Sequence, residues 1–465
     1  MAVSASAMGR HSGAQNIRFI IAASSVGTMI EWYDFYLYGV LAGFFAAHFF
    51  PGDMKNSFLF SLGIFWTGFV VRPFGAILFG HLGDLIGRKF TFMLTLVLMG
   101  AATFAVGVLP VYDSIGWAAP VLLVACRVVQ GLALGGEYGG AATYIAEHAP
   151  DGKRGLYTSW IQTTATMGIV FALLVIMAFR LGMGDANFTA YGWRYPFLLS
   201  AVLVILSGWL RLRLEESPLF AQLKSQGKSS HNPVAETYSS GKNIGQMLIA
   251  LFGATAPEGV VWYTGQFYAL FYMTVVLKVP FVTAYWILIV ALAIGSLGFI
   301  FFGWLSDAIG RKWIMVAGFA LGVVTYIPTF QAMATYKDSA PALTLLVLYM
   351  VILVTMVYGP IAAFLVEYFP ARIRYSSMSL PYHIGNGVFG GGTPFIGGMI
   401  AAAYPAVTLP VFGAVGPLVG LLYPMGIAAI GVVIGGLAIP NTTSQTRIWD
   451  EVGGRRKIPV VPDQP

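Results

Sequence analysis

The sequence predicts an all-α membrane protein with twelve transmembrane helices in two six-helix bundles. The first observation is composition: of 465 residues, 57% are hydrophobic and 10% are charged, and the mean hydropathy is +0.76, too apolar for a soluble protein of this length. The second is a repeat: Gly80 to Lys89, GHLGDLIGRK, returns as Gly303 to Lys312, GWLSDAIGRK. Both copies occupy a short polar gap between long apolar runs, so the chain consists of two similar halves.

Apolar runs that can cross the hydrocarbon as helices follow one another along the chain, since about 20 residues suffice. We expect spans near residues 18–45, 57–79, 90–110, 119–146, 156–179, 194–214, 244–274, 281–302, 313–333, 342–367, 375–403 and 418–439. The longest polar interval lies between the halves and predicts a linker. The expected organisation is a cytoplasmic N-terminal segment, a first bundle, a cytoplasmic linker, a second bundle and a cytoplasmic tail, at residues 1–17, 18–214, 215–243, 244–439 and 440–465.

The placement of positive charge orients these helices. With a cytoplasmic N-terminus, 19 of the 26 Lys and Arg residues fall in cytoplasmic segments and 5 on the outer side, so we expect both termini in the cytoplasm. The net charge of +7 therefore reflects membrane topology, and nucleic acid is not expected as a partner. No signal peptide is expected, because the polar start leads into a helix without a small-residue cleavage site. The lone Cys126 excludes an intramolecular disulfide and a thiolate metal cluster.

The first span carries two acids, Glu31 and Asp34, in GTMIEWYDFYLYG, Gly27 to Gly39. Each costs about 3 kcal/mol at mid-span, so such groups usually face a polar cavity or a partner. Three residues apart, they share one helical face. At least one of them is a candidate proton site or substrate contact, with Asp34 the first choice and Tyr33 a neighbouring substrate contact. The alternative is a pair of structural acids bound to an adjacent helix.

Two arginines also lie inside predicted spans. Arg127 requires an anion nearby, which could be Asp34, Glu31 or an anionic substrate. Gln130 lies one helical turn further on and shares its face. Arg72 is expected to be a gate or packing residue paired with an acid, or else a ligand contact. The glycines of the fourth span would let a neighbouring helix approach, at positions 131, 135, 136, 139 and 140.

The second half offers polar and aromatic side chains for a small-molecule site. Glu258 falls nearly in register with the acids of the first span, after Pro257, which could break the helix. His383 could titrate near neutral pH or be a hydrogen-bonded core histidine. The Gly- and Pro-rich run 385–394 is expected to loosen its helix for movement. The substrate-binding candidates beyond the first span are Arg127, Gln130, Gln162, Trp262, Tyr263, Gln266, His383 and Asn386, with interfacial aromatics as the alternative for Trp262 and Tyr263.

Each half also places an acid pair and an arginine on the predicted cytoplasmic face. Glu147 and Arg154 recur as Glu367 and Arg374, at nearly the offset that separates Asp84 from Asp307. Such a triad can hold the cytoplasmic side closed in one state and release it in another. The alternative is that it only stabilises the loops.

These motifs resemble the major facilitator superfamily and, within it, the metabolite:H+ symporter family. Five stretches carry the resemblance: GTMIEWYDFYLYG, VRPFGAILFGHLGDLIGRK, RVVQGLALGGEYGGAATYIAEHAP, GWRYPF at 192–197 and LEESPLF at 214–220. The resemblance implies a two-bundle carrier whose central cavity opens alternately to each side. It places Asp34 and Arg127 at charged core positions, and it implies cytoplasmic gate residues at Asp84, Arg88, Glu147, Arg154, Asp307, Arg311, Glu367 and Arg374. Leu85 and Ala308 stand where many relatives have a basic residue, which implies a weaker latch.

We therefore expect a secondary active transporter in the bacterial inner membrane, functioning as a monomer, that takes up a small organic acid or zwitterion together with protons. Protonation of Asp34 or Glu31 would free Arg127 for an anionic substrate, and Glu258 is a further proton-coupling candidate. The alternatives are a proton-independent facilitator, exchanger or exporter, and a metabolite-binding sensor. An enzyme is not expected, and neither a metal nor a cofactor is, because the six histidines are scattered and no nucleophile lies near a base.

Overall fold

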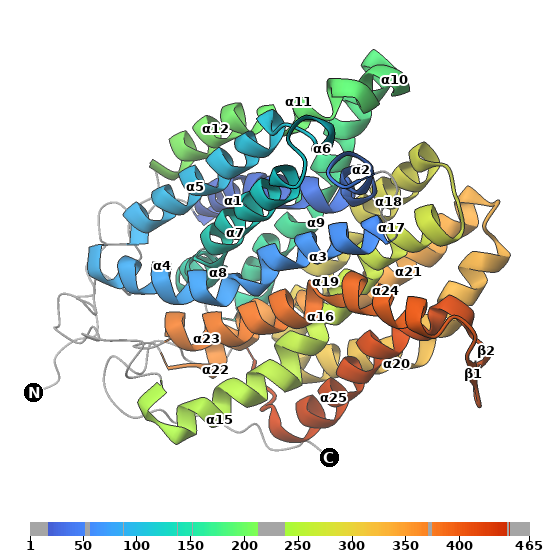
Figure 1. Cartoon of the computed structure of the whole chain (residues 1–465). Helices are drawn as coiled ribbons and strands as arrows, with labels where there is room; N and C mark the ends of the chain where they lie inside the picture. The colour runs from blue at the N-terminus through green and yellow to red at the C-terminus, as the bar shows by residue number, and fades with distance from the viewer. Residues whose placement is uncertain are drawn as a thin grey trace, which may run out of the picture.

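The computed structural model describes residues 17–51, 56–86, 88–136, 138–150, 152–212, 238–370, 374–443 and 446. Within this part of the chain helices dominate, and the two halves pack side by side (Figure 1). The linker expected at 215–243 falls mostly outside the described residues, which resume at 238.

The helices of the first half cover the first six predicted spans. Helices α1 and α2 form the first, α3 and α4 the second, α7 and α8 the fourth, and α11 and α12 the sixth, each pair joined by a break of one or two residues. Their bounds are α1 Ile17–Val40, α2 Ala42–His48, α3 Ser57–Val70, α4 Arg72–Ile86, α5 Arg88–Val108, α6 Tyr112–Ile115, α7 Ala118–Gly135, α8 Tyr138–His148, α9 Arg154–Met183, α10 Asp185–Asn187, η1 Phe188–Gly192, α11 Arg194–Leu198 and α12 Ser200–Leu212.

The second half covers the other six predicted spans and contains several π-helical turns. A short antiparallel hairpin, β1 (Thr408–Leu409) and β2 (Gly413–Ala414), joins the last two spans. The helix bounds are α15 Gly241–Ala250, η2 Leu251–Thr255, α16 Ala256–Tyr263, η3 Thr264–Tyr268, α17 Ala269–Phe271, η4 Tyr272–Val276, α18 Phe281–Gly295, α19 Leu297–Ile309, α20 Lys312–Thr335, α21 Ala340–Tyr358, α22 Ile361–Tyr368, α23 Arg374–Tyr382, η5 His383–Gly390, α24 Thr393–Ala403, η6 Gly416–Leu421 and α25 Leu422–Ala438.

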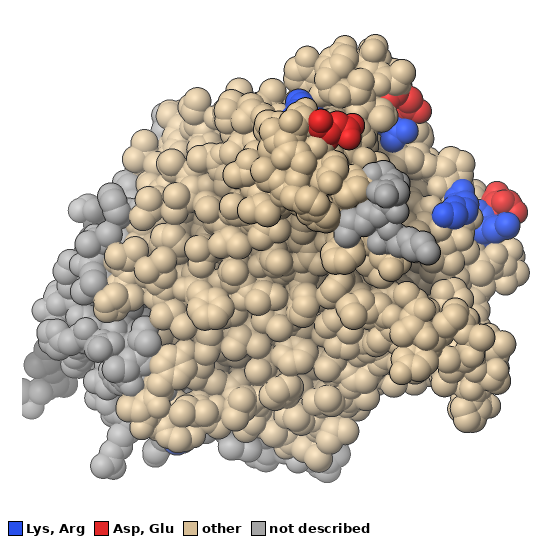
Figure 2. Space-filling view, in the orientation of Figure 1, with Lys and Arg blue, Asp and Glu red and all other residues tan. Residues whose placement is uncertain are grey.

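The surface of the bundle suits a membrane. Among the described residues, nine helical segments are long and apolar enough to cross a bilayer. Large apolar side chains face outward on many helices, for example Ile205, which is 74% exposed, and Leu297, which is 68% exposed. Figure 2 shows one face with a broad band free of charge among the described residues, and most of its charged side chains lie at the upper and right-hand edges. The molecule is an all-α, multi-pass membrane protein, as predicted.

Glycines in the fourth span set the close contact between the second and fourth spans. A Cβ on Gly131 would lie 2.0 Å from the Gly68 carbonyl oxygen, and one on Gly135 would lie 2.1 Å from that of Arg72. Only glycine lets the two backbones come this near. The packing role predicted for these two glycines is confirmed, and the contact fixes the backbone at Arg72.

Two predicted irregularities take the form of π-helical turns. The helix does not break at Pro257, because the π-helical turn η2 precedes it and the proline stands in the first turn of α16. The Gly-rich part of the eleventh span is π-helical from His383 to Gly390. Such wide turns are common at functional sites, since they leave backbone groups less tightly bound.

Candidate functional site

Arg72 lies at the centre of the interface between the two halves. It begins α4, and its side chain is fully buried. The guanidinium lies over three aromatic rings, 5.4 Å from the centroid of Trp32, 5.7 Å from Phe69 and 5.9 Å from Tyr382 of the second half. None of its three nitrogen atoms has a hydrogen-bond partner among the described residues. Because an unsatisfied buried cation is costly, this group is suited to binding an anion.

Glu258 faces this arginine from the second half. Its carboxylate is fully buried on α16 and accepts two hydrogen bonds from the Asn386 amide nitrogen, at 3.0 and 2.7 Å. Arg72 and Glu258 interact electrostatically but form no ion pair within 4 Å. Gly259 brings α16 against η5, since a Cβ there would lie 2.7 Å from the Gly385 carbonyl oxygen. The interface therefore holds a cation and an anion apart.

Aromatic side chains of both halves surround the two charges. The hydroxyls of Tyr36 and Tyr263 lie 3.4 Å apart across the interface, and Trp262 stacks on Tyr36 with ring centroids 5.4 Å apart. Gln266 is also fully buried, and its side-chain nitrogen and oxygen atoms make no hydrogen bond with described residues. His383 is fully buried beside the backbone of Gly135. The result is an apolar, aromatic region with a few polar groups, as small-molecule sites in proteins usually are.

One face of the molecule is closed below this centre by ion pairs that cross between the halves. Arg154 at the start of α9 contacts Glu367 of α22 at 2.8 Å, and Arg311 contacts the same carboxylate at 3.0 Å. Asp307 of α19 accepts hydrogen bonds from the Gly155 and Leu156 backbone N–H groups, both at 2.8 Å. The contacts of Arg154, Gly155 and Leu156 join the start of α9 to the second half and shut this face, which is the one predicted to be cytoplasmic.

The structure describes the side chains of some of the remaining predicted gate residues, but not of all of them. Arg374 of the second half and Glu147 of the first lie 3.6 Å apart, so this pair also crosses the interface. Asp84 lies in α4 and Arg88 begins α5, but their side chains lie outside the described part. Among the described side chains, the two Arg–Glu pairs of the predicted triads thus cross between the halves, whereas Arg311 pairs with Asp307 and Glu367 within the second half.

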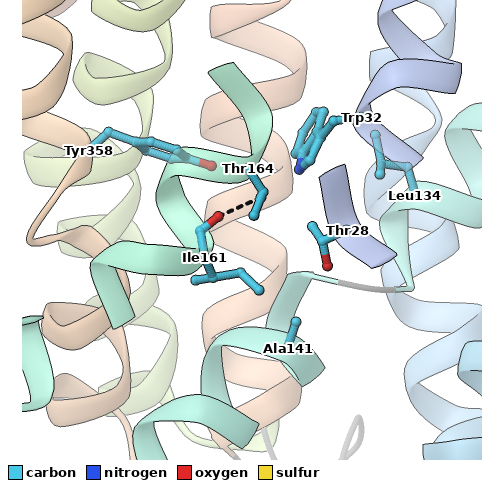
Figure 3. Close-up of a pocket in the computed structure, with 7 residues that line it drawn as sticks. All are labelled: Thr28, Trp32, Leu134, Ala141, Ile161, Thr164 and Tyr358. Atoms are coloured by element: carbon cyan, nitrogen blue, oxygen red, sulfur yellow. Dashed lines mark hydrogen bonds between the residues drawn. The ribbon is translucent and has the colours of Figure 1, made fainter. Parts of the chain in front are cut away.

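Two cavities lie on either side of the centre. A recess of about 10 Å³, room for about one water molecule, is lined by Trp32, Tyr358 and Thr164, whose hydroxyl donates to the Ile161 carbonyl (Figure 3). A larger cavity of about 400 Å³ opens on the face opposite the gate, between α1, α2 and α3 of the first half and α17, η4 and α18 of the second. At the wall of this cavity Tyr285 of α18 donates to the Val40 carbonyl of α1, so the halves are in contact on this side as well.

Comparisons with known proteins identify the family. A family model described as "Sugar (and other) transporter" matches residues 19–240. The shikimate transporter of Escherichia coli K12 is 34% identical over 80% of this chain and 85% of its own length. The alpha-ketoglutarate permease of the same strain is 33% identical over 84% of this chain and 90% of its own length. A proline/betaine transporter of the same strain is 31% identical over 90% and 83%. The chain belongs to the metabolite:H+ symporter family of the major facilitator superfamily.

The fold is that of the superfamily. The structure of a major facilitator proton:xylose symporter superposes with a TM-score of 0.70 at 18% identity, covering 92% of this chain and 97% of that one. A second crystal structure, of a D-xylose-proton symporter, gives a TM-score of 0.68. The chain is therefore a membrane transporter built of two six-helix bundles, and not an enzyme.

In this major facilitator chain, Arg127 lies within the first bundle. Its guanidinium donates to the Phe35 carbonyl at 3.0 Å, to the Gln130 side-chain oxygen at 2.7 Å and to the Phe65 carbonyl at 3.4 Å. Gln130 in turn donates to the Thr103 hydroxyl at 2.8 Å. Arg127 and Gln130 thus belong to a network that holds α1, α3, α5 and α7 together.

The structure does not bring Arg127 to either acid of the first span. Glu31 instead lies 2.7 Å from Arg211 at the end of α12. Asp34 is fully buried, and neither of its oxygens has a hydrogen-bond partner among the described residues. Two residues correspond to about 200° around a helix, so Asp34 points away from the face that carries Tyr36 and Trp32 to the interface. It therefore faces the inside of the first bundle.

The other substrate candidates separate into two groups. Trp262, Tyr263, Gln266, His383 and Asn386 lie in α16, η3 and η5, and Glu258 lies in α16. Two others make protein contacts: the Tyr33 hydroxyl donates to the Pro196 carbonyl at 2.6 Å, and the Gln162 amide donates to the Tyr358 carbonyl at 3.0 Å, which links the halves.

Sequence reasoning missed the aromatic residues around Arg72, namely Trp32, Tyr36, Phe69, Tyr358 and Tyr382. Tyr358 and Tyr382 share a hydrogen bond at 2.7 Å between their hydroxyls. The sequence offered only a weak signal for these residues, because aromatic residues are frequent in all the predicted spans. What distinguishes these five from the other aromatic residues is that their side chains face the interface between the halves. Tyr382 could have been found as the neighbour of His383.

Proposed function

We propose that the chain is a proton-coupled symporter that takes up a small organic acid or a zwitterionic metabolite by alternating access, in the inner membrane of a bacterium and with both termini in the cytoplasm. The observation that carries the proposal is Arg72, a buried guanidinium between the two bundles without a hydrogen-bond partner among the described residues. Relatives named as shikimate, alpha-ketoglutarate and proline/betaine transporters support a carboxylate-bearing substrate.

Arg72 is suited to a carboxylate because its planar fork can donate two parallel hydrogen bonds. The anion contact is thus assigned to Arg72, since protein acceptors already bind the guanidinium of Arg127. Trp262 and Gln266 would contact the body of the substrate, because they are buried in the same part of the second half and their side-chain polar atoms lack partners among the described residues. His383, buried next to Tyr382, would contribute as well. Aromatic walls favour a compact substrate with an apolar or ring-shaped body.

Alternating access would use the ion pairs of the gate. Arg154 and Glu367 lie in different bundles, so opening this face to the cytoplasm requires their separation. Substrate shifts the equilibrium between the two states only through its different affinity for each. Protons enter through a buried acid, and the candidates are Asp34, Glu31 and Glu258.

The experiment is to add carboxylates and zwitterions outside proteoliposomes that contain the purified protein and to record internal pH. Acidification with one compound, absent from protein-free vesicles, supports proton symport of that compound. Exchange of labelled compound without acidification would replace the symporter with a facilitator or exchanger.

An Arg72→Lys variant makes the same experiment test the site. Lysine keeps the charge but loses the two-pronged geometry. We expect uptake to fall at least tenfold while the variant still purifies as a folded protein. Full uptake by this variant would remove Arg72 from the site.

A further inference from the structure

The larger cavity, on the face opposite the gate, has a charged wall that the proposed function does not use. Its volume of about 400 Å³ lies within the range of small-molecule sites in proteins. Helix α9 begins at the gate with Arg154 and reaches the cavity near its other end with Arg180, about 39 Å away along the helix axis. The cavity is thus remote from the ion pairs of the gate.

Arg180 gives this cavity a cation with free donors. Its Nε donates to the Asp185 carboxylate, and the guanidinium forms no other hydrogen bond with the residues that the structure describes. Asp185 is 70% exposed and does not line the cavity, so it holds the arginine from the solvent side. The guanidinium lies 4.2 Å from the ring centroid of Phe281, which does line the cavity. The two terminal amino groups of Arg180 are therefore available to an anion.

Two other polar side chains of the cavity wall are already bound to the backbone. Carbonyl oxygens of Phe44 and Thr189 lie 2.9 and 3.2 Å from the two ring nitrogens of His48. The Thr274 hydroxyl donates to the Leu270 carbonyl at 2.9 Å. The free charged donors on this wall, within the described part of the chain, are thus those of the arginine.

Aromatic rings from both halves form much of the remaining wall. Phe58 of α3 and Phe271 of α17 meet edge to face across the interface, with ring centroids 5.5 Å apart. The rings of Phe281 and Tyr285 on α18 lie 3.7 Å apart. Such walls suit a flat or compact apolar body, whereas Arg180 suits a carboxylate.

A contact between the halves separates this cavity from the aromatic centre. The Tyr285 hydroxyl of α18 donates to the Val40 carbonyl of α1. Val40 lies one helical turn, about 6 Å, beyond Tyr36, whose hydroxyl is near that of Tyr263 at the centre. A ligand in the cavity and a ligand beside Arg72 would therefore occupy different sites.

We propose that this cavity is a second binding site, for a small carboxylate with a ring-shaped body. Arg180 binds the carboxylate through its terminal amino groups, and Phe58 and Phe271 hold the body. A ligand held here lies one helical turn from the centre and enters it when Tyr285 separates from Val40. The inference goes beyond the proposed function, because the charge and the rings of the cavity assign the ligand, and not the relatives.

The test is the protection of a cysteine in the cavity wall. Thr274→Cys, in a Cys126→Ser background, places the thiol at a half-buried position that lines the cavity. A maleimide labels this cysteine in purified protein, with benzoate or cyclohexanecarboxylate as the charged probes. Benzyl alcohol and cyclohexylmethanol are the uncharged probes with the same rings. We expect the carboxylates to slow labelling, and the alcohols to need at least tenfold higher concentrations for the same protection.

Arg180→Gln then tests the assigned donor. Loss of the guanidinium should raise the half-protecting concentration of either carboxylate at least tenfold and leave that of the alcohols unchanged. Lys337→Gln is the matched control, because it removes one positive charge from an exposed position that does not line the cavity. Equal labelling rates without probe show that the cavity keeps its shape in both variants. If Arg180→Gln changes that rate, the comparison of charged with uncharged probes in protein with Arg180 decides.

The outcomes separate the inference from the proposed function. Equal protection by carboxylates and alcohols, no protection by either carboxylate, or full protection in Arg180→Gln would overturn the second site. In Arg72→Lys, protection should survive, and its loss there would place the carboxylate at the centre and overturn the inference as well. Proteoliposomes that take up no compound, made from protein whose cavity is still protected by benzoate, would overturn the proposed function and leave the second site in place.

Discussion

Removing the charge of Glu367 should open the gate. This carboxylate accepts from Arg154 at 2.8 Å and from Arg311 at 3.0 Å, and both arginines are buried. In Glu367→Gln, the amide keeps the shape and one acceptor oxygen but loses the charge. Only the bond from Arg154 crosses between the bundles, because Arg311 and Glu367 both belong to the second half. Hydrogen bonds to charged groups contribute about 1.5 to 3 kcal/mol each, and neutral ones about half, so the closed arrangement loses about 0.7 to 1.5 kcal/mol relative to the open one.

That loss changes the ratio of closed to open molecules roughly three- to tenfold. Arg311 remains bound to Asp307 at 2.8 Å, which keeps the loss below the cost of stripping a buried arginine of every partner. The assay is the rate at which a maleimide labels a cysteine placed at Ala363, a fully buried position of α22, after Cys126→Ser removes the native thiol. Labelling should accelerate about three- to tenfold in Glu367→Gln and stay unchanged in the control Asp185→Asn. An unchanged rate in Glu367→Gln would refute the view that these pairs hold the face shut.

Three further predictions concern stability. Gly135→Ala should lower the melting temperature in detergent by several degrees, because the new Cβ would lie 2.1 Å from the Arg72 carbonyl oxygen. The control Gly426→Ala should leave the melting temperature unchanged, since a Cβ there meets nothing within 4 Å. Equal melting temperatures of the two variants would contradict the packing argument. Arg127→Lys should lower the melting temperature by several degrees through loss of its hydrogen bonds to Phe35 and Gln130, and retention of full stability would show that the network is dispensable. The pKa of the Asp185 carboxyl is held below its ordinary value, because Arg180 donates a hydrogen bond to it. Any stabilisation from this pair is therefore present above the ordinary pKa of Asp and is lost as the pH falls. Since the pair is exposed, Asp185→Asn should leave the melting temperature at pH 7 unchanged, and a clear drop would contradict this.

The gate shows how far a repeat can be interpreted. The duplication of Gly80–Lys89 and of the Glu and Arg that follow indicates which residues act together. In the structure Arg311 pairs with Asp307 and Glu367 of its own copy, while Arg154 pairs with Glu367 of the other copy. The pairing across the halves could not be predicted. Two copies of a motif show that the sites are equivalent, but they do not show whether each partner comes from its own copy or from the other.

The central site shows the opposite case. Arg127 and Asp34 attract attention because isolated charges in apolar runs are conspicuous, yet Arg127 is bound by the carbonyl of Phe35 and the side chain of Gln130. Backbone acceptors leave no trace in composition or spacing. Arg72 looked like a packing residue in the sequence, and only its position among Trp32, Phe69 and Tyr382 reveals a buried guanidinium at the interface.

The sequence by itself determined that this protein is a helical membrane protein of two related halves, because hydrophobic length and repetition are properties of the chain in order. It also determined where helices can approach closely, as at Gly131 and Gly135, since the absence of a side chain is local. Only the tertiary structure decided which charges meet, which acid faces the interface and which arginine stands between the bundles. The physical reason is that a helix's period fixes which residues share a face, whereas the direction of that face is set by the packing of helices far apart in the chain.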